Sequence, residues 1–161
     1  MRLHGRYLLG ALAVPAGIVA LAFVALRGPW SPLALDRADA RYVAGDLDGA
    51  VAAYVEVAQG WSTLSVRAEA ASRAAALAPD DLEVLGELAE LHAPAGPADA
   101  LSEAFLNALR RILALRPDDV QALFFLGLDG ARRGDAPAAR GHWERLLAVL
   151  PPGAPVAAEI K

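Results

Sequence analysis

Three seven-residue segments of this chain share one pattern, and each of them ends in a proline. Each segment has the form Arg-x-x-Ala, then Leu or Val, then any residue and Pro, and the prolines are Pro79, Pro117 and Pro151. Proline cannot continue a helix, so each segment is predicted to end one helix. Pro117 and Pro151 are 34 residues apart, whereas Pro79 and Pro117 are 38 apart. The chain is therefore predicted to consist of repeated helical units, with four additional residues near the loop at 93–97.

The last unit has small and bulky residues where a pair of crossing antiparallel helices requires them. Gly127 and Ala139 are small, as expected at a close crossing, and Trp143 fills the wider space beside them. Gly134 can adopt the left-handed conformation that ends the first helix, and Asp135 can cap the second. The period and these positions resemble the tetratricopeptide repeat (TPR), which implies an α-solenoid. The residues at TPR positions along the chain are Gly45, Ala50, Tyr54, Pro79, Pro117, Gly127, Gly134, Ala139, Trp143 and Pro151.

The composition favours an all-α fold of antiparallel helix pairs. Hydrophobic residues make up 56% of the chain but aromatic residues only 6%, so the apolar surface comes mostly from Ala, Leu and Val, which suit close helix packing. The segment 62–78 resembles the second helix of a unit whose first helix is missing or merged, so the repeat count is approximate. The predicted helices are 33–44, 47–59, 62–78, 81–93, 98–115, 119–133 and 136–149, with a short capping helix within 154–161.

The N-terminal part is apolar and basic. Tyr7 to Leu26 is a run of 20 residues without a charge, which as a helix spans ~30 Å, the thickness of a bilayer core. Arg2 and Arg6 precede this run, and the positive-inside rule then places the N-terminus in the cytoplasm and the following domain outside it. We therefore predict a single-pass inner-membrane (cytoplasmic-membrane) protein whose TPR domain is periplasmic.

Two interpretations of this segment stay open. It is either an uncleaved transmembrane signal-anchor helix or a signal peptide cleaved near Ala20-Leu21-Ala22. The anchor is favoured because the apolar run continues for four residues past that site. Both interpretations export the domain. The predicted organisation is a signal-anchor segment at 1–27, a proline-containing linker at 28–32 and a TPR-like helical domain at 33–161.

Charge and residue types exclude several classes of function. Residues 36–161 carry 12 basic and 19 acidic side chains, a difference of −7, which disfavours nucleic acid and favours basic protein partners. The chain has no cysteine, and its three histidines lie in different segments without the spacing of metal ligands. Asp80-Asp81 and Asp118-Asp119 are better explained as helix caps than as catalytic pairs. We predict no catalytic residues, no metal and no cofactor.

The last unit and its tail, residues 114–160, resemble the C-terminal domain of the TPR subunit of cytochrome c maturation, the CycH-type biogenesis proteins. The segments that carry this resemblance are Ala122–Leu128, Arg133–Asp135, Trp143–Pro152 and Ala154–Ile160. The stretch Trp-Glu-Arg-Leu-Leu followed by a double proline is closer to this family than to TPR proteins in general. The rest of the chain resembles TPR proteins only.

The resemblance implies a function. Members of that family are membrane-anchored chaperones of the periplasm that hold apocytochrome c, through its C-terminal helix, for the haem-ligation complex. It implies the same role here, although this chain has one apolar segment where larger members have two. The alternative, from the fold alone, is a generic TPR scaffold that assembles a membrane or envelope protein complex.

A stack of TPR helix pairs binds peptides on the concave face formed by the first helix of each pair. Phe124 and Leu128 are apolar and one helical turn apart, which suits the apolar side of an amphipathic helix, unless a neighbouring helix covers them. Glutamates on this face are suited to Lys or Arg of the partner. The residues predicted to form the concave face are Tyr42, Glu83, Glu90, Gln121, Phe124, Leu128 and Arg132.

Overall fold

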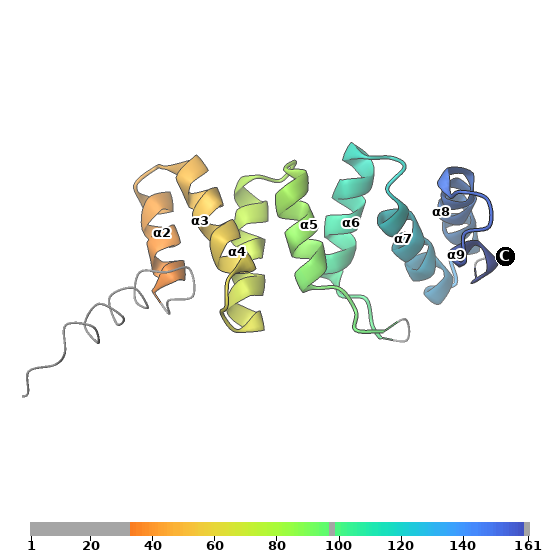
Figure 1. The fold of residues 1–161 in the computed structure, drawn as a ribbon, viewed down its shortest axis with the longest axis horizontal. Coiled ribbons are helices and arrows are strands. Elements are labelled where there is room, and N and C mark those ends of the chain that lie inside the picture. Colours follow the sequence, from red (N-terminus) through yellow and green to blue (C-terminus); the bar gives the residue numbers. More distant parts are fainter. Residues whose placement is uncertain (1–32, 97–98, 160–161) are drawn as a thin grey trace, which may run out of the picture.

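The computed structural model describes residues 33–96 and 99–159, and within them the chain forms helices and no strand. Figure 1 shows the helices as a row in which each one runs antiparallel to the next. The helices are α2 (Ala34–Val43), α3 (Leu47–Gln59), α4 (Leu64–Leu77), α5 (Leu82–Leu91), α6 (Glu103–Leu115), α7 (Val120–Arg132), α8 (Ala136–Val149) and α9 (Val156–Glu159).

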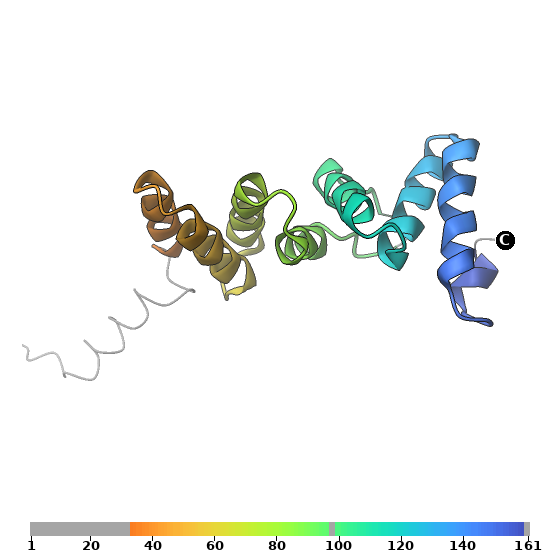
Figure 2. The same cartoon turned by 90° about the horizontal axis from the view of Figure 1, so that it is seen from above.

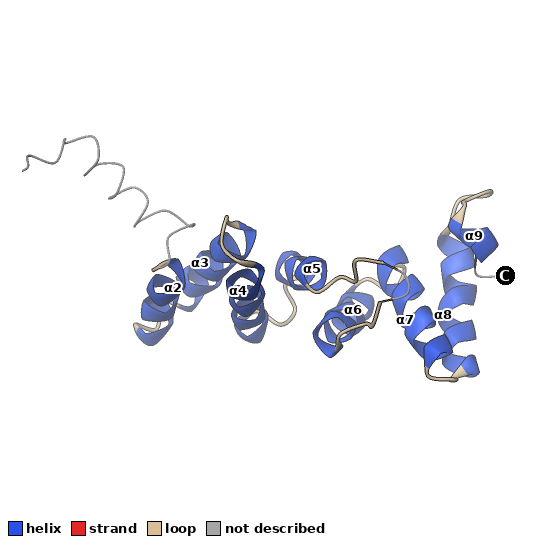
Figure 3. Cartoon of the chain, turned by 90° about the horizontal axis from the view of Figure 1, so that it is seen from below, coloured by secondary structure: helices blue, strands red, loops and turns tan. Residues whose placement is uncertain are grey.

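Each helix from α2 to α8 packs against the next, and α3 also contacts α5. Seen from above and from below, α2, α4 and α6 lie in one layer and α3 and α5 in the other (Figures 2 and 3). This arrangement is consistent with an α-solenoid and confirms the expected all-helical fold of packed adjacent pairs. The predicted segment 62–78, which resembles the second helix of a unit without its first helix, corresponds to α4.

The helices begin and end where local sequence signals place them. Asp46, Asp81, Asp119 and Asp135 cap α3, α5, α7 and α8, each accepting a hydrogen bond from a backbone N–H of the following turn. The three repeated prolines each follow directly on the C-cap residue of a helix. The glycines in the α2–α3 and α7–α8 turns have positive φ, +82° at Gly45 and +75° at Gly134. The predicted caps and turns are therefore confirmed.

The predicted start of the fifth helix, at residue 98, is wrong. α6 begins at Glu103, because the Ser102 side chain accepts a hydrogen bond from the backbone N–H of Phe105 and so fixes the N-cap. Asp99 instead holds a turn, its carboxylate accepting from the N–H of Gly96. The other predicted helices are found with their described ends within two residues.

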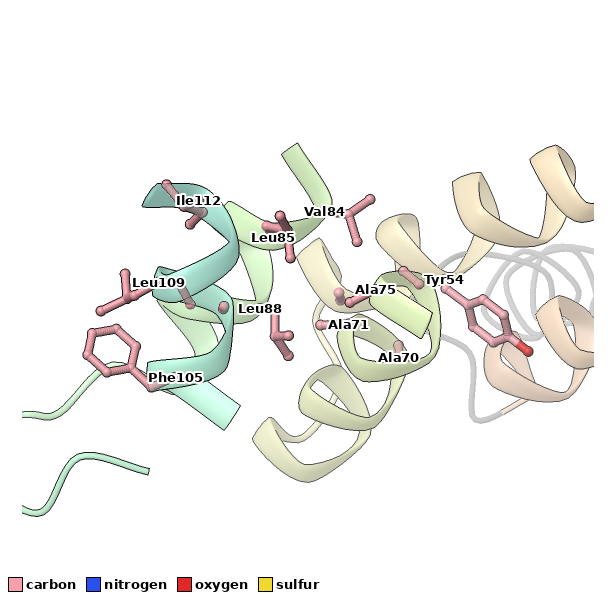
Figure 4. Packing of buried hydrophobic residues seen from close by; sticks show 14 of the residues in the cluster. Tyr54, Ala70, Ala71, Ala75, Val84, Leu85, Leu88, Phe105, Leu109 and Ile112 are labelled. Carbon is pink, nitrogen blue, oxygen red and sulfur yellow. The ribbon is translucent and has the colours of Figure 1, made fainter. Parts of the chain in front are cut away.

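The core changes in character along the row of helices. Around α4 it is made of alanines, and Figure 4 shows Ala70, Ala71 and Ala75 beside Tyr54. Farther along, larger side chains of α5 and α6 face each other, and Leu85, Leu109 and Phe105 have no exposed surface. Alanine lets helices approach closely but buries little apolar area. The N-terminal part of the core therefore depends more on polar contacts between its helices.

Such a polar contact joins α2, α3 and α4. The Tyr54 hydroxyl donates to Asp39 Oδ1 at 2.5 Å, and Nη1 of Arg73 donates to both oxygens of the same carboxylate at 2.5 and 2.6 Å. The Arg73 and Tyr54 hydrogen bonds lower the pKa of Asp39, and Arg73, bonded to Asp39 and Glu69, has its pKa raised. Burial, followed by the hydrogen bond to Asp39, raises the pKa of Tyr54. The three residues form one hydrogen-bonded unit between three helices.

Separating the Asp39–Arg73 pair is expected to cost about 1 kcal/mol of coupling energy, as for partly exposed ion pairs with good geometry. The measurement is a double-mutant cycle with Asp39→Asn and Arg73→Gln in urea denaturation. Because the folded pKa of Asp39 is lowered, this stabilisation is complete above the ordinary pKa of an aspartate and is lost as the pH falls through the folded pKa. The exposed pair Glu103–Arg110, 3.5 Å apart, is the control and is expected to show less coupling. Equal coupling in the two pairs would contradict this assignment.

α7 and α8 cross at the small residues that the repeat pattern predicts. However, Gly127 and Ala139 do not lie against each other, and each contacts another residue. Gly127 lies against the Trp143 ring, where an added Cβ would collide with Nε1 of the indole. Ala139 lies against Gly130, whose added Cβ would be 2.9 Å from the Ala139 backbone nitrogen. Trp143 thus covers Gly127 itself, and Nε1 of the indole lies 3.4 Å from the Phe124 carbonyl oxygen, to which it donates. α7 and α8 are therefore in close contact at Gly127 and at Gly130, which are about one helical turn apart.

The predicted signal-anchor segment at 1–27 and the linker at 28–32 lie outside the described residues. Among the residues that the structure does describe, no helix has the length and apolar character needed to cross a membrane.

Candidate peptide-binding surfaces

One face of α7 presents four of the seven residues predicted to bind a partner. Gln121 and Arg132 are exposed there, and Phe124 and Leu128 are half-buried. Their spacing of three or four residues places them on one side of the helix. The structure therefore brings these four together, and Phe124 and Leu128 keep part of their surface uncovered by the described helices.

Phe124 is the last of three phenylalanine rings that contact one another in sequence. Its ring meets that of Phe125 edge to face, with centroids 5.2 Å apart, and Phe125 meets Phe105 in the same way at 5.0 Å. Phe105 on α6 is fully buried. Edge-to-face contacts of this kind are favourable beyond simple burial. The contacting rings therefore lead from the core at Phe105 to the surface at Phe124.

Among the predicted partner-binding residues, Arg132 contacts the loop between α5 and α6, and two glutamates lie on α5. Nη1 of Arg132 donates to the Asp99 carbonyl oxygen, at 2.5 Å, in the loop between α5 and α6. Glu83 and Glu90 are exposed on the outer side of α5, seven residues and thus two turns apart. Their carboxylates have no hydrogen-bond or ion-pair partner among the described residues. They are available to a basic partner.

Tyr42 lies elsewhere. It is half exposed at the end of α2 and lines a hollow of about 270 Å³ together with Asp39, Tyr54 and Arg73. Because α4 stands between α3 and α5 in the alternating row, α5 falls in the layer of α3, opposite to α2 (Figures 2 and 3). The structure therefore does not bring Tyr42 to the side of the molecule on which Glu83 lies.

A groove between α3 and the first turn of α5 was not predicted from the sequence. Its volume is about 600 Å³, and Leu77 and Ala78 at the end of α4 contribute to its lining. Leu47, Val51 and Val55 of α3 lie along it at four-residue spacing. The sequence signal that could have revealed this groove is the four-residue spacing itself, next to but distinct from Ala50 and Tyr54, which are predicted TPR positions.

A third surface, between α6 and α8, is basic. Arg110, Arg133 and Arg145 line a hollow of about 390 Å³ whose floor holds the buried Asp129. Asp129 lies 2.7 Å from Arg133 and 3.9 Å from Arg110, and Arg145 donates to the Pro117 carbonyl oxygen. Burial, with the nearby Arg145, lowers the pKa of His142 beside them. The arginines therefore serve contacts within the chain.

The described residues contain no group of His, Cys, Asp or Glu side chains arranged to hold a metal ion. The α7 face, the outer side of α5 and the α3–α5 groove present partly exposed apolar side chains or carboxylates without a partner among the described residues. No protein-family model, curated protein or solved structure matches this chain.

Proposed function

We propose that this chain is a membrane-anchored, extracytoplasmic TPR chaperone or adaptor that holds apocytochrome c for haem ligation. The observation that carries the proposal is the partly exposed Phe124–Leu128 pair on α7, supported from the core by two further aromatic rings. The pair lies within Ala122–Leu128, one of the segments that resemble the cytochrome c maturation subunit. An apolar pair one turn apart suits the apolar side of a helix.

The partner in this proposal is the C-terminal helix of apocytochrome c, handed on to subunits of the haem-ligation complex. Glu83 and Glu90 on α5 supply charges for basic residues of such a helix. The uncharged run from Tyr7 to Leu26 supports the membrane anchor. The work of the protein is binding, and the proposal includes no catalytic step, cofactor or nucleic acid.

A deletion strain of the organism that encodes the chain tests the cellular role. The expected result is loss of all covalently haem-bearing cytochromes while their apoproteins are still synthesised, seen by haem staining and immunoblotting. The generic TPR scaffold predicts instead normal cytochromes and failure to assemble one membrane or envelope complex. Normal cytochromes in the deletion strain would therefore contradict the apocytochrome role.

Replacing Phe124 and Leu128 together by Ala is expected to weaken binding of the apocytochrome c C-terminal peptide by about tenfold to a hundredfold. Each substitution removes apolar surface that the bound helix would bury, and every 1.4 kcal/mol is a factor of about ten in affinity. Fluorescence anisotropy with a labelled peptide measures the affinity, and circular dichroism checks that the helices remain. Leu115→Ala with Val149→Ala is the control, because both are exposed apolar residues at the ends of α6 and α8, outside the α7 face. Unchanged affinity in a folded Phe124/Leu128 variant contradicts the assignment.

A further inference from the structure

The groove between α3 and α5 combines an apolar floor with an acidic rim. Val51, Val55 and Leu77 are half-buried along it, and Val84 closes its inner side. Four carboxylates surround these residues, and they belong to Asp48, Glu56, Asp81 and Glu83. Of the described residues that line the groove, none is Lys, Arg or His. Its surface is therefore both apolar and strongly negative.

Three of the four carboxylates are uncommitted. Asp48, Glu56 and Glu83 have no hydrogen-bond or ion-pair partner for their side chains among the described residues. Asp81 accepts two backbone N–H bonds as the cap of α5. The nearby Arg67 of α4 is already engaged with the Ala58 carbonyl oxygen and with Glu87. Nothing described in the chain neutralises the rim, so a cationic partner would gain electrostatic attraction there.

The dimensions of the groove fit a helix. Its α3 wall extends over the whole of Leu47–Gln59, and 13 residues of helix are ~20 Å long, so about three turns of a partner helix can lie along it. The last residues of α4 close the gap between α3 and α5 from one side, and the groove is open on the other. Packed helices lie roughly 8–10 Å apart, as consecutive helices of a bundle do. A fourth helix in the groove would complete a small bundle with these three.

We propose that the α3–α5 groove binds a basic amphipathic helix of a partner protein, with apolar residues at i, i+3 or i+4 and i+7 against Val51 and Val55. Lys or Arg residues on the two flanks of that helix would pair with Asp48 and Glu56 on one side and Glu83 on the other. This goes beyond the proposed function, since the groove does not include Phe124 or Leu128 and requires no particular identity of the partner; the two surfaces share only Glu83, so the Val51/Val55 and Phe124/Leu128 variants are the ones that separate them.

The experiment uses the full chain in a neutral detergent and three fluorescein-labelled synthetic peptides of about 14 residues, long enough for three to four helical turns. The first is amphipathic with Leu on one side and Lys on the other, the second has Glu in place of Lys, and the third is a scrambled Leu/Lys sequence. Anisotropy is compared between protein variants in the same detergent, so that binding of peptide to micelles cancels. The expected order has the amphipathic basic peptide at least about tenfold tighter than the other two.

The decisive variant carries Asp48→Asn, Glu56→Gln and Glu83→Gln. Each exposed charge pair changes the affinity by less than tenfold. The loss of all three is expected to weaken binding of the basic amphipathic peptide about tenfold. The control variant carries Asp36→Asn, Asp118→Asn and Glu144→Gln, which removes the same net charge from exposed residues outside the groove. It is expected to stay within about threefold of the wild type.

A second variant, Val51→Ala with Val55→Ala, tests the apolar floor and is expected to weaken binding as well, with circular dichroism confirming the helices. The Phe124/Leu128 variant is expected to bind this peptide normally, so failure of the groove and failure of the proposed function are distinguishable. An equal loss in the groove and control charge variants would overturn the proposal, because it would mean nonspecific attraction to an acidic protein. Absence of any preference for the amphipathic basic peptide would overturn it too.

Discussion

Phe105→Ala is expected to lower the free energy of unfolding by about 3–5 kcal/mol, the usual cost of removing a fully buried aromatic ring. Phe105 has no exposed surface, and its ring supports Phe125, which in turn supports Phe124 on the α7 face. The cavity left by the substitution would lie in the part of the helix row where larger side chains replace the alanines. Urea denaturation followed by circular dichroism measures the loss.

The matched control for this prediction is Phe124→Ala. It removes the same ring from a half-buried position at the surface end of the same aromatic chain and is expected to cost less than half as much. Phe105→Ala is also expected to weaken peptide binding to the α7 face, because Phe124 loses its support. If the two substitutions cost the same stability, the assignment of Phe105 to the centre of the core is contradicted.

Gly130→Val is expected to destabilise the domain by about 3 kcal/mol, because it inserts a branched side chain into a closed helix crossing. A Cβ at this position would lie 2.9 Å from the Ala139 backbone nitrogen and 3.3 Å from its Cα. Backbone atoms cannot turn aside as a flexible side chain does, so α7 and α8 would have to separate. Thermal and urea denaturation of the purified full chain provide the measurement.

Gly141→Val is the control for the crossing. Gly141 is an exposed residue of α8, and a Cβ there would meet nothing within 4 Å. Since glycine and valine differ little in helix propensity, this change is expected to alter stability by less than about 0.5 kcal/mol. A destabilisation of similar size at both positions would show that the cost arises from the helix itself and would refute the close crossing.

Features set by neighbouring residues in the chain could be predicted from the sequence. Asp46, Asp119 and Asp135 cap their helices, and Gly45 and Gly134 adopt positive φ, as their positions before or after apolar helical segments indicate. The all-helical fold of packed pairs followed from the same signals and from the repeated prolines. The shared face of α7 is a local feature too, since helical spacing alone decides which of its residues lie on one side.

Features set by how the helices are placed in space could not be predicted in this way. The sequence marks α4 as irregular but does not say that this helix places α5 in the layer opposite to α2, which separates Tyr42 from Glu83 (Figures 2 and 3). The α3–α5 groove likewise exists only because α3 and α5 become neighbours across the end of α4. The start of α6 was missed because Ser102 competes with an apolar-rich stretch that is otherwise compatible with helix.

The two proposed binding surfaces differ in their chemistry, because the α7 face is mainly aromatic and aliphatic and the α3–α5 groove is acidic. The proposed apocytochrome surface relies mainly on the apolar Phe124 and Leu128 of α7, with Glu83 and Glu90 of α5 as its charged contacts, and the Arg132 guanidinium holds the α5–α6 loop. The α3–α5 groove relies on uncompensated carboxylates around valines. Because the two ligand preferences differ, raised salt is expected to weaken binding to the groove more than binding to the α7 face.

Calorimetric titration of the full chain in detergent with a synthetic peptide of the apocytochrome c C-terminal helix tests the central claim most directly. The proposed function predicts saturable binding of one peptide per chain, which the Phe124→Ala, Leu128→Ala variant weakens and the Leu115→Ala, Val149→Ala variant preserves. Absence of binding by a chain whose circular dichroism shows intact helices would contradict it.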